Sequence, residues 1–290
     1  MFDREEAIPL REVEFRLLRD LIKEYCGLFF DDGSMFLLEK RLSRRLKVHQ
    51  LNDFRDYYRF LLYDRKRDEE LTCVIDLLTV NETFFFREQN QLKAFSDEIL
   101  PELRETNRES KRIRIWSAGC STGEEPYTIA MLALEYGYLY GWDIEILGSD
   151  INQRVLTTAR RGVYRKNSFR STGRSFVDKY FAEENGSFTI SEEVKRLVSF
   201  SCLNLLDPFK AKFVGKMDVI FCRNVLIYFD QNARKKVVDT FYDSIVEGGY
   251  LLLGHAESLM NISTSFALRH LKNDMVYQKP ILQERTAHVR

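Results

Sequence analysis

The sequence predicts an α/β fold with a mostly parallel sheet, preceded by an all-helical N-terminal domain. Apolar residues recur at helical spacing through the first 80 residues. After residue 112, short apolar runs of strand type alternate with helical patterns, as in a parallel sheet with crossover helices. The first of these runs leads through a glycine-containing turn into a helix. Such a turn lies at the carboxyl edge of a parallel sheet, where ligands bind.

The composition limits the possible classes of protein. The 290 residues allow one large domain and a smaller one. Lys plus Arg and Asp plus Glu both number 44, so the balanced charge gives no argument for nucleic acid or a membrane as partner. No apolar run approaches the ~18 residues of a membrane span and no signal-peptide pattern follows Met1, so we expect a cytoplasmic protein without membrane insertion. Five separated cysteines without a C-x-x-C pair indicate neither a fully paired disulfide framework nor a zinc site, and no metal is expected.

Residues 1–80 are predicted to form the helical N-terminal domain. Leu18 and Ile22 share one face of its first helix, and Gly27 is expected to end that helix. The other helices of this domain are expected at 34–48, 53–63 and 68–79.

The helix at 34–48 has two contrasting faces. One narrow face carries the apolar residues Met35, Leu38, Leu42 and Leu46. The other side carries the cations Lys40, Arg41, Arg44, Arg45 and Lys47. A run of this kind is either a solvated helix face or a docking surface for an acidic partner.

Residues 81–112 are predicted to be a linker segment followed by a helix at about 89–105. Phe84, Phe85 and Phe86 are adjacent, so their rings cannot all face one side of a helix or strand. Some must pack inward while others reach a second surface, as expected of a segment between two domains. The alternative is a buried aromatic linker with Arg87 in a surface ion pair.

The domain at 113–290 begins with a strand, a glycine turn and a helix. Gly119 and Gly123 let the backbone turn tightly and approach a ligand. A dinucleotide site is disfavoured because the third glycine of G-x-G-x-x-G is missing and because Glu124 and Glu125 open the helix where a pyrophosphate would sit. Carboxylates there would attract a cation, which favours a positively charged, phosphate-free nucleoside such as S-adenosylmethionine. Alternatively, both glutamates only complement the helix dipole.

The second strand, 143–150, ends in Asp150. In this fold a carboxylate at that strand end can accept hydrogen bonds from ribose hydroxyls. Asp150 could equally cap the following helix at 151–161, and both roles can coexist.

The rest of the chain continues the α/β pattern after an interruption. Residues 163–198 are predicted to form a small, mostly antiparallel insertion, with a hairpin turn at Asn185-Gly186. The later core elements are expected as strands at 197–206 and from 217 to Arg223-Asn224, a helix at 231–246 ending at Gly248-Gly249, a strand at 250–253 and a closing β-pair within 266–279.

Four segments together resemble the CheR family of bacterial chemotaxis methyltransferases. They are Asn81–Glu88, Ser117–Tyr127, Gly148–Asp150 and Phe221–Asp230, and they occur in the family's order. The resemblance covers nearly the whole chain. It implies a class I methyltransferase fold, Rossmann-like with a mostly parallel seven-stranded sheet, a helical N-terminal domain and a small inserted β-subdomain. The implied activity is transfer of methyl groups from S-adenosylmethionine to glutamates of chemoreceptors, with S-adenosylhomocysteine as the second product.

The resemblance also implies the residues of the site. Together with Gly119 of the turn, the cofactor pocket would be lined by Asn81, Thr83, Arg87, Glu124, Asp150, Asn204, Leu205, Arg223 and Asn224. Arg87 and Tyr228 would lie nearest the transferred methyl group. The basic helix at 34–48 would meet the methylation region of the receptor. In some family members the insertion binds a pentapeptide at the receptor C-terminus, and residues 163–198 contain no signature that we can match to it.

The expected chemistry needs little acid–base catalysis. A glutamate carboxylate has a reference pKa of about 4.3 and is already ionised at neutral pH. Two alternatives are a nucleic-acid methyltransferase and a non-catalytic signalling module that responds to S-adenosylmethionine. The first often carries an N-P-P-Y-like strand tip, whereas this chain has Arg-Asn-Val-Leu-Ile-Tyr there.

Overall fold

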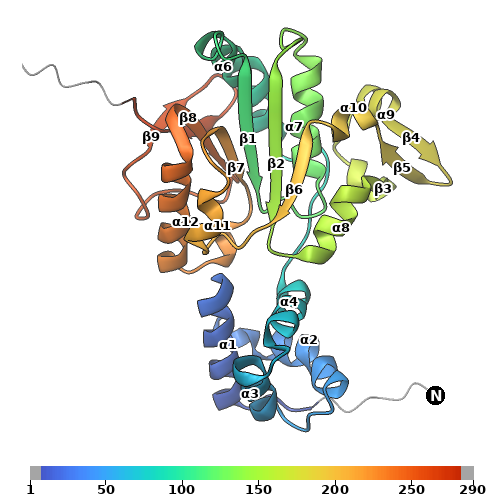
Figure 1. Ribbon diagram of the computed structural model, residues 1–290, viewed down its shortest axis with the longest axis vertical. Helices are drawn as coiled ribbons and strands as arrows, with labels where there is room; N and C mark the ends of the chain where they lie inside the picture. The colour runs from blue at the N-terminus through green and yellow to red at the C-terminus, as the bar shows by residue number, and fades with distance from the viewer. Residues whose placement is uncertain (1–7, 282–290) are drawn as a thin grey trace, which may run out of the picture.

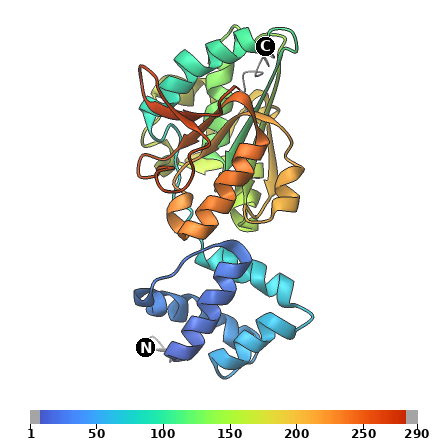
Figure 2. The same cartoon turned by 90° about the vertical axis from the view of Figure 1, so that its left-hand side faces the viewer.

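The computed structural model describes residues 8–281 and has two parts joined by an extended linker (Figures 1 and 2). The N-terminal part consists of α1 (Glu12–Cys26), α2 (Met35–Val48), α3 (Phe54–Tyr63) and α4 (Arg67–Leu78). It lies at one end of the larger α/β part, below the sheet in both views. The all-helical N-terminal domain is therefore confirmed.

Helix α1 ends where the two parts meet. Its buried stripe includes Phe15, Leu18 and Ile22. Gly27 terminates the helix in a left-handed conformation with φ +80, and its N–H donates to the Lys23 carbonyl over 2.8 Å. A Cβ on Gly27 would lie 2.7 Å from Leu206 Cδ1, so this glycine also permits close contact with the α/β domain.

Helix α2 buries its apolar face as predicted, with Leu38, Leu42 and Leu46 fully covered. Two of its cationic residues bind other residues of the helical domain, and the other three are exposed. Arg41 Nη1 donates to the carbonyls of Leu77 and Leu78, both at 2.9 Å, and so satisfies the end of α4. Arg45 is bound to Glu70 within the domain. The residues of the run that remain exposed are Lys40, Arg44 and Lys47.

Glu70 is the polar centre of the helical domain and is only 2% exposed. Its Oε1 accepts hydrogen bonds from Tyr57 (2.5 Å) and Arg45 Nε (2.8 Å), and His49 Nε2 lies 2.7 Å from its Oε2. Burial alone would raise the pKa of Glu70, but hydrogen bonds from Arg45, Tyr57 and His49 outweigh it and lower that pKa. One carboxylate thus ties α2, α3 and α4 together.

The α/β domain contains a seven-stranded sheet of order β6-β2-β1-β7-β8-β10-β9. Its strands are β1 (Arg112–Ala118), β2 (Asp143–Asp150), β6 (Val198–Cys202), β7 (Met217–Cys222), β8 (Ile245–Leu253), β9 (Ala267–His270) and β10 (Met275–Gln278). The first five pair in parallel, and β10 pairs antiparallel with β8 and β9. The mostly parallel sheet and the closing β-pair are confirmed.

Helices cover both faces of this sheet (Figure 1). They are α5 (Gln89–Ala94), α6 (Leu100–Thr106), α7 (Glu124–Glu135), α8 (Gln153–Arg161), the short α11 (Pro208–Lys212) and α12 (Gln231–Ser244), with a π-helical turn, Phe95–Ile99, joining α5 to α6. Alternate strand residues enter separate cores. Phe221 packs with the linker helix and α7, whereas Ile220 packs with α12.

The insertion between α8 and β6 forms a separate antiparallel sheet of order β3-β5-β4, as expected. It contains β3 (Val163–Arg165), α9 (Arg174–Tyr180), β4 (Phe181–Glu184), β5 (Ser187–Ile190) and α10 (Glu192–Lys195). Asn185 and Gly186 connect β4 to β5 with φ values of 50 and 70, the positive angles of the predicted hairpin turn.

The boundaries of four predicted elements are wrong. Helix α12 ends at Ser244 and not near residue 246, because Ile245 is extended (φ −81, ψ 139) and pairs with Met217 to begin β8. Gly248, with φ +77, lies within that strand. The strand expected at 197–206 is shorter, and α8 begins at Gln153 because the side chain of Asn152 caps it.

We predict that Glu70→Gln lowers the free energy of unfolding by about 3 kcal/mol at neutral pH, because the variant cannot balance the partly buried charge of Arg45. The folded-state pKa of Glu70 is lowered, so its contribution is complete above the unfolded value of about 4.3 and is lost as the pH falls through the folded value. Urea unfolding of both proteins at a series of pH values measures this difference. The exposed neighbour Glu69 supplies the control, and equal stabilities of Glu69→Gln and Glu70→Gln at neutral pH would refute the role of the network.

Candidate active site

A cavity lies at the carboxyl edge of the sheet, between the two parts of the chain. It encloses about 1270 Å³ of space, its open mouth included. Its wall comes from the linker, the glycine turn, the ends of β2 and β7, and the N-terminal domain. The polar and small residues of the wall are Thr79, Asn81, Glu82, Thr83, Arg87, Gly119, Ser121, Glu125, Thr128, Asp150, Asn204, Arg223, Asn224 and Tyr228.

The glycine turn leaves no room for a side chain at Gly119. This residue has φ +79, and a Cβ on it would lie 2.3 Å from Val225 Cγ2. The backbone N–H groups of Gly119 and Cys120 donate to the Ser149 carbonyl at 2.8 and 2.9 Å. The turn is therefore held against the end of β2, and its backbone forms part of the cavity wall.

Asp150 connects the end of β2 to the same turn. Its Oδ2 accepts from the N–H of Ser121 (2.8 Å) and its Oδ1 from the N–H of Asn152 (2.9 Å). Burial raises the pKa of Asp150, while these backbone donors oppose that rise. The carboxylate borders the cavity with acceptor capacity left on both oxygens, which suits the vicinal hydroxyls of a ribose.

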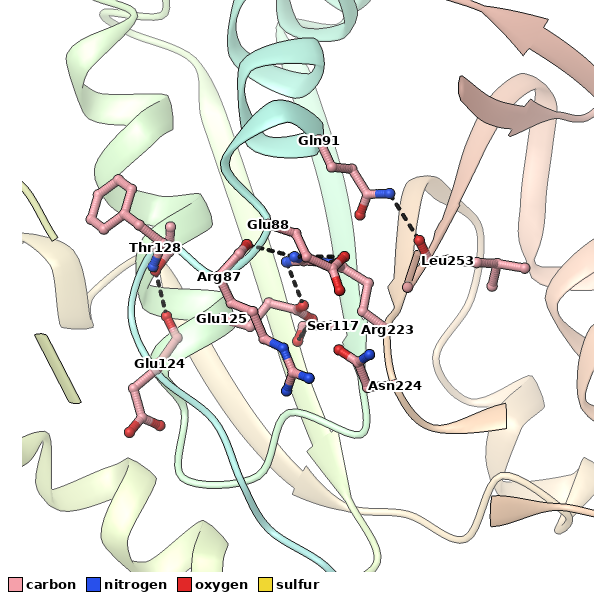
Figure 3. A network of polar contacts seen from close by, with 12 residues as sticks. Arg87, Glu88, Gln91, Ser117, Glu124, Glu125, Thr128, Arg223, Asn224 and Leu253 are labelled. Carbon is pink, nitrogen blue, oxygen red and sulfur yellow. Dashed lines mark hydrogen bonds and ion pairs between the residues drawn. The ribbon is translucent and has the colours of Figure 1, made fainter. Parts of the chain in front are cut away.

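Glu125, rather than Glu124, borders the cavity (Figure 3). Glu124 is 2% exposed, and its carboxylate accepts hydrogen bonds from Thr122 Oγ1 (2.6 Å) and Ser168 Oγ (3.1 Å), outside the cavity wall. Its position therefore does not support the cofactor role expected for it. The two glutamates are adjacent at the start of α7, and one helical step of 100° turns them toward different surroundings.

Arg223 is surrounded by carboxylates at the back of the cavity (Figure 3). Its side chain is 3% exposed, with Nη1 3.1 Å from Glu125 Oε2 and Nη2 3.1 Å from Glu88 Oε2. Nη2 also donates to the Arg87 carbonyl over 2.5 Å. One positive charge against two negative charges gives this cluster, of which Arg223 and Glu125 line the cavity, a net charge of about −1. Such an environment favours a cationic ligand.

Arg87 and Tyr228 both reach the cavity wall. The Nη1 of Arg87 donates to the Glu82 carbonyl (3.1 Å), and within residues 8–281 its guanidinium forms no ion pair. Burial raises the pKa of Tyr228, so its hydroxyl is protonated and able to donate at neutral pH. The Tyr228 carbonyl accepts from the Phe29 N–H over 2.9 Å, so the N-terminal domain helps to place this residue.

The two predicted asparagines differ in what they can offer to a ligand. Asn204 borders the cavity, but its Nδ2 donates to the Tyr25 carbonyl (2.6 Å) and its Oδ1 accepts from the Leu206 N–H (3.0 Å). Asn224 has a buried Oδ1 that finds no hydrogen-bond partner among residues 8–281. An unpartnered buried acceptor in a cavity wall is costly unless a ligand donor satisfies it.

The remaining predicted residues, Asn81, Thr83 and Leu205, also line the cavity. Sequence reasoning missed several others. Glu125 belongs to the motif already quoted, and only the helical direction of its side chain identifies it. Cys26, Leu28 and Thr79 come from the N-terminal domain. They reach the cavity because the two domains dock against each other. No local pattern in the sequence predicts that docking.

Three features define a class I S-adenosylmethionine-dependent methyltransferase. They are the sheet order, the carboxylate at the end of β2 and a turn whose acidic residues disfavour a bound phosphate. The wall fits this cofactor, since it combines a net negative charge, a strand-end carboxylate and the unpartnered oxygen of Asn224. Comparison with known families agrees. The chain matches the CheR methyltransferase all-alpha domain over residues 13–79 and the CheR methyltransferase SAM binding domain over residues 81–275. It belongs to the CheR methyltransferase family.

Relatives within this family are similar over nearly their whole length. The chain is 38% identical to chemotaxis protein methyltransferase 2 of Vibrio cholerae over 275 residues, which cover 94% of this chain and 95% of that protein. Identity to the chemotaxis protein methyltransferase of Borreliella burgdorferi is 37%, covering 87% and 90%. Identity to the Escherichia coli enzyme is 34%, covering 91% of each.

Between residues 8 and 281 no helix has the length and apolar character needed to cross a membrane. Over the same residues, no three His, Cys, Asp or Glu side chains gather as a metal-binding group.

We predict that Glu125→Gln weakens the binding of S-adenosylmethionine at least about tenfold, equivalent to ~1.4 kcal/mol. The substitution removes the excess negative charge that remains after Arg223 and Glu88 neutralise each other. Calorimetric titration of the folded protein gives the dissociation constant. Glu124→Gln is the matched control and should leave that constant within about twofold of the unmodified protein, because Glu124 faces Thr122 and Ser168. Equal losses in both variants would argue against the assignment of Glu125.

Proposed function

We propose that this methyltransferase esterifies glutamate side chains in the cytoplasmic region of bacterial chemoreceptors. The names of the relatives support a role in chemotaxis, and the glutamate acceptor follows from the resemblance to the CheR family. The observation that carries the proposal is the presence of a guanidinium without an ion pair, that of Arg87, on the wall of an otherwise acidic cofactor cavity. An acidic acceptor needs such a counter-charge to enter.

The chemistry requires alignment more than proton transfer. S-adenosylmethionine supplies an electrophilic methyl group, and when a carboxylate oxygen takes it the C–S bond breaks with its electron pair left on sulfur, giving S-adenosylhomocysteine. The acceptor carboxylate has a reference pKa of about 4.3 and is ionised at neutral pH, so no residue has to remove a proton. Holding the two reactants in line can lower the barrier by several kcal/mol.

Arg87 and Tyr228 are the residues that we propose to hold the acceptor. The guanidinium of Arg87 can bind one carboxylate oxygen and leave the other free to attack, and the Tyr228 hydroxyl can donate to the same group. A tight grip on the ionised acceptor would stabilise the ground state and slow the reaction. We therefore expect both residues to orient the acceptor rather than to bind it strongly.

We propose that the cofactor is held by residues from the linker, the glycine turn and the strand ends that form the cavity wall. The strand-end carboxylate of Asp150 takes the ribose hydroxyls, and Glu125 with Asn224 faces the charged amino-acid end. The other proposed contacts are Asn81, Thr83, Gly119, Asn204, Leu205 and Arg223.

Two exposed cations of α2, Lys40 and Arg44, are proposed as the docking surface for the acidic methylation region. Arg41 and Arg45 are excluded from that surface because both are bound within the helical domain. The inserted sheet offers a second contact. β4 is an outer strand of the order β3-β5-β4, so an extended receptor C-terminal peptide could pair with it by β-augmentation.

One assay distinguishes the candidate functions. Tritium transferred from labelled S-adenosylmethionine to receptor-containing membranes and released by base as methanol would identify a carboxyl ester. Base-stable label would indicate an amine or nucleic-acid acceptor instead. Cofactor binding without any transferred label would favour a non-catalytic module.

Arg87→Ala should reduce the rate of this methyl transfer at least about tenfold, because the acceptor carboxylate loses its orienting cation. Arg170→Ala is the matched control. Arg170 stacks 3.7 Å from the centroid of the Phe84 ring and pairs with Glu82 over 2.8 Å, but it lies outside the cavity wall. Normal turnover in Arg87→Ala would remove this residue from the proposed mechanism.

Reversing two charges on α2, in Lys40→Glu with Arg44→Glu, should raise the KM for the receptor about tenfold at low salt. The cofactor dissociation constant should not change, and added salt should shrink the effect because the cations are exposed. The double variant Lys235→Glu with Lys236→Glu, on α12, reverses the same number of exposed charges elsewhere. A similar KM increase in both double variants would indicate a general charge effect and not a docking surface.

A further inference from the structure

The carboxylate of Glu257 lies behind the loop that follows β7 and accepts hydrogen bonds from four backbone N–H groups. Its Oε2 accepts from Asn224 and Gly254, both at 2.8 Å. Its Oε1 accepts from Val225 (2.8 Å) and Ile227 (3.2 Å). Three of these donors belong to one short loop, residues 223–228, whose chain therefore wraps around a single side chain.

That loop carries a large share of the site. Arg223, Asn224 and Tyr228 all line the cavity. Asn224 has φ +59, a left-handed conformation that costs a non-glycine residue free energy. Its N–H and the next one both point at Glu257. The carboxylate thus offsets the cost of the conformation adopted by Asn224, a residue of the cavity wall.

Gly254 closes the opposite side of this arrangement. A Cβ there would lie 2.8 Å from the Asn224 backbone nitrogen, 2.9 Å from Asn224 Nδ2 and 2.9 Å from Glu257 Oε2. The end of β8 and the end of β7 therefore approach each other so closely that only glycine fits between them.

We infer that Glu257 is a positioning residue for cofactor binding, acting through the backbone of residues 224–227 and not by touching the cofactor. It does not belong to the cavity wall, in contrast to the loop that it holds. Burial raises the pKa of this carboxyl, and the four N–H donors oppose that rise. Within residues 8–281 no cation pairs with it, so these backbone dipoles are its compensation.

A glutamine cannot replace this carboxylate. Each oxygen of Glu257 serves two N–H groups, whereas an amide has one oxygen and one NH₂. In either orientation of the amide, two backbone donors would face another donor. The loop must then shift away from the conformation that Asn224 and Tyr228 need.

The test is Glu257→Gln, measured by calorimetric titration with S-adenosylhomocysteine at a temperature at which circular dichroism shows a folded protein. We expect the dissociation constant to rise at least about tenfold. Asp218→Asn is the control. Asp218 is a buried carboxylate at the other end of β7 that accepts from the Arg114 N–H over 2.7 Å. It should lower the melting temperature but leave the dissociation constant within about twofold.

Gly254→Ala perturbs the same contact while retaining the carboxylate, and it decides the matter if Glu257→Gln does not fold. A raised dissociation constant in folded Glu257→Gln, or in Gly254→Ala when the glutamine variant is unfolded, supports the inference if Asp218→Asn is unaffected. Unchanged cofactor binding in folded Glu257→Gln overturns it, as does unchanged binding in folded Gly254→Ala when the glutamine variant is unfolded. An equal rise in Asp218→Asn also overturns it. Because no acceptor is present, the result does not depend on whether glutamate is the substrate.

Discussion

The buried guanidinium of Arg223 is the interaction on which the site depends. From the end of β7 it binds Glu88 of the linker, Glu125 at the start of α7 and the carbonyl of Arg87. These segments are far apart in the sequence and meet at one side chain that is 3% exposed. Because depriving this buried guanidinium of a carboxylate partner costs several kcal/mol, neither Glu88 nor Glu125 can move away alone. The start of α7 after the glycine turn, the end of β7 and the linker are therefore held together by this one side chain.

The charge of the molecule is balanced in total but divided in space. Glu125 and Asp150 make the wall of the cavity acidic, whereas Lys40 and Arg44 leave α2 with an exposed positive face. An acidic acceptor would be attracted to the outer surface and repelled by the inner one. Arg87 belongs to the cavity wall, with its guanidinium near the Glu82 carbonyl and the Phe84 ring. It is the group that could let a carboxylate approach an acidic cofactor site.

Periodicity and turn chemistry predicted most of the fold, because these signals are local. Gly27 ended its helix, Asn185-Gly186 formed its hairpin, and the closing β-pair appeared where alternation placed it. The start of β8 was missed because pairing of Ile245 with Met217 outweighed the local helical pattern. Within the site, choosing between Glu124 and Glu125 needed a side-chain direction, and finding Cys26 or Leu28 needed the docking of two domains. Neither the side-chain direction nor the domain docking can be predicted from adjacent residues in the sequence.

The N-terminal domain contributes residues to the wall of the cofactor cavity. The end of α1 meets the loop after β7 through a bridge between Leu28 and Phe229, and Lys23 pairs with Asp230 over 2.7 Å. At the end of α4, the Thr79 hydroxyl accepts from Asn152 Nδ2 over 2.8 Å, next to Asp150. The domain that presents the cations of α2 thus touches both the segment that carries Tyr228 and the strand end that carries Asp150. A partner bound to α2 would act on a domain whose other end forms the wall around the reacting groups. The proposed docking surface on α2 and the shape of the cofactor site are therefore physically connected.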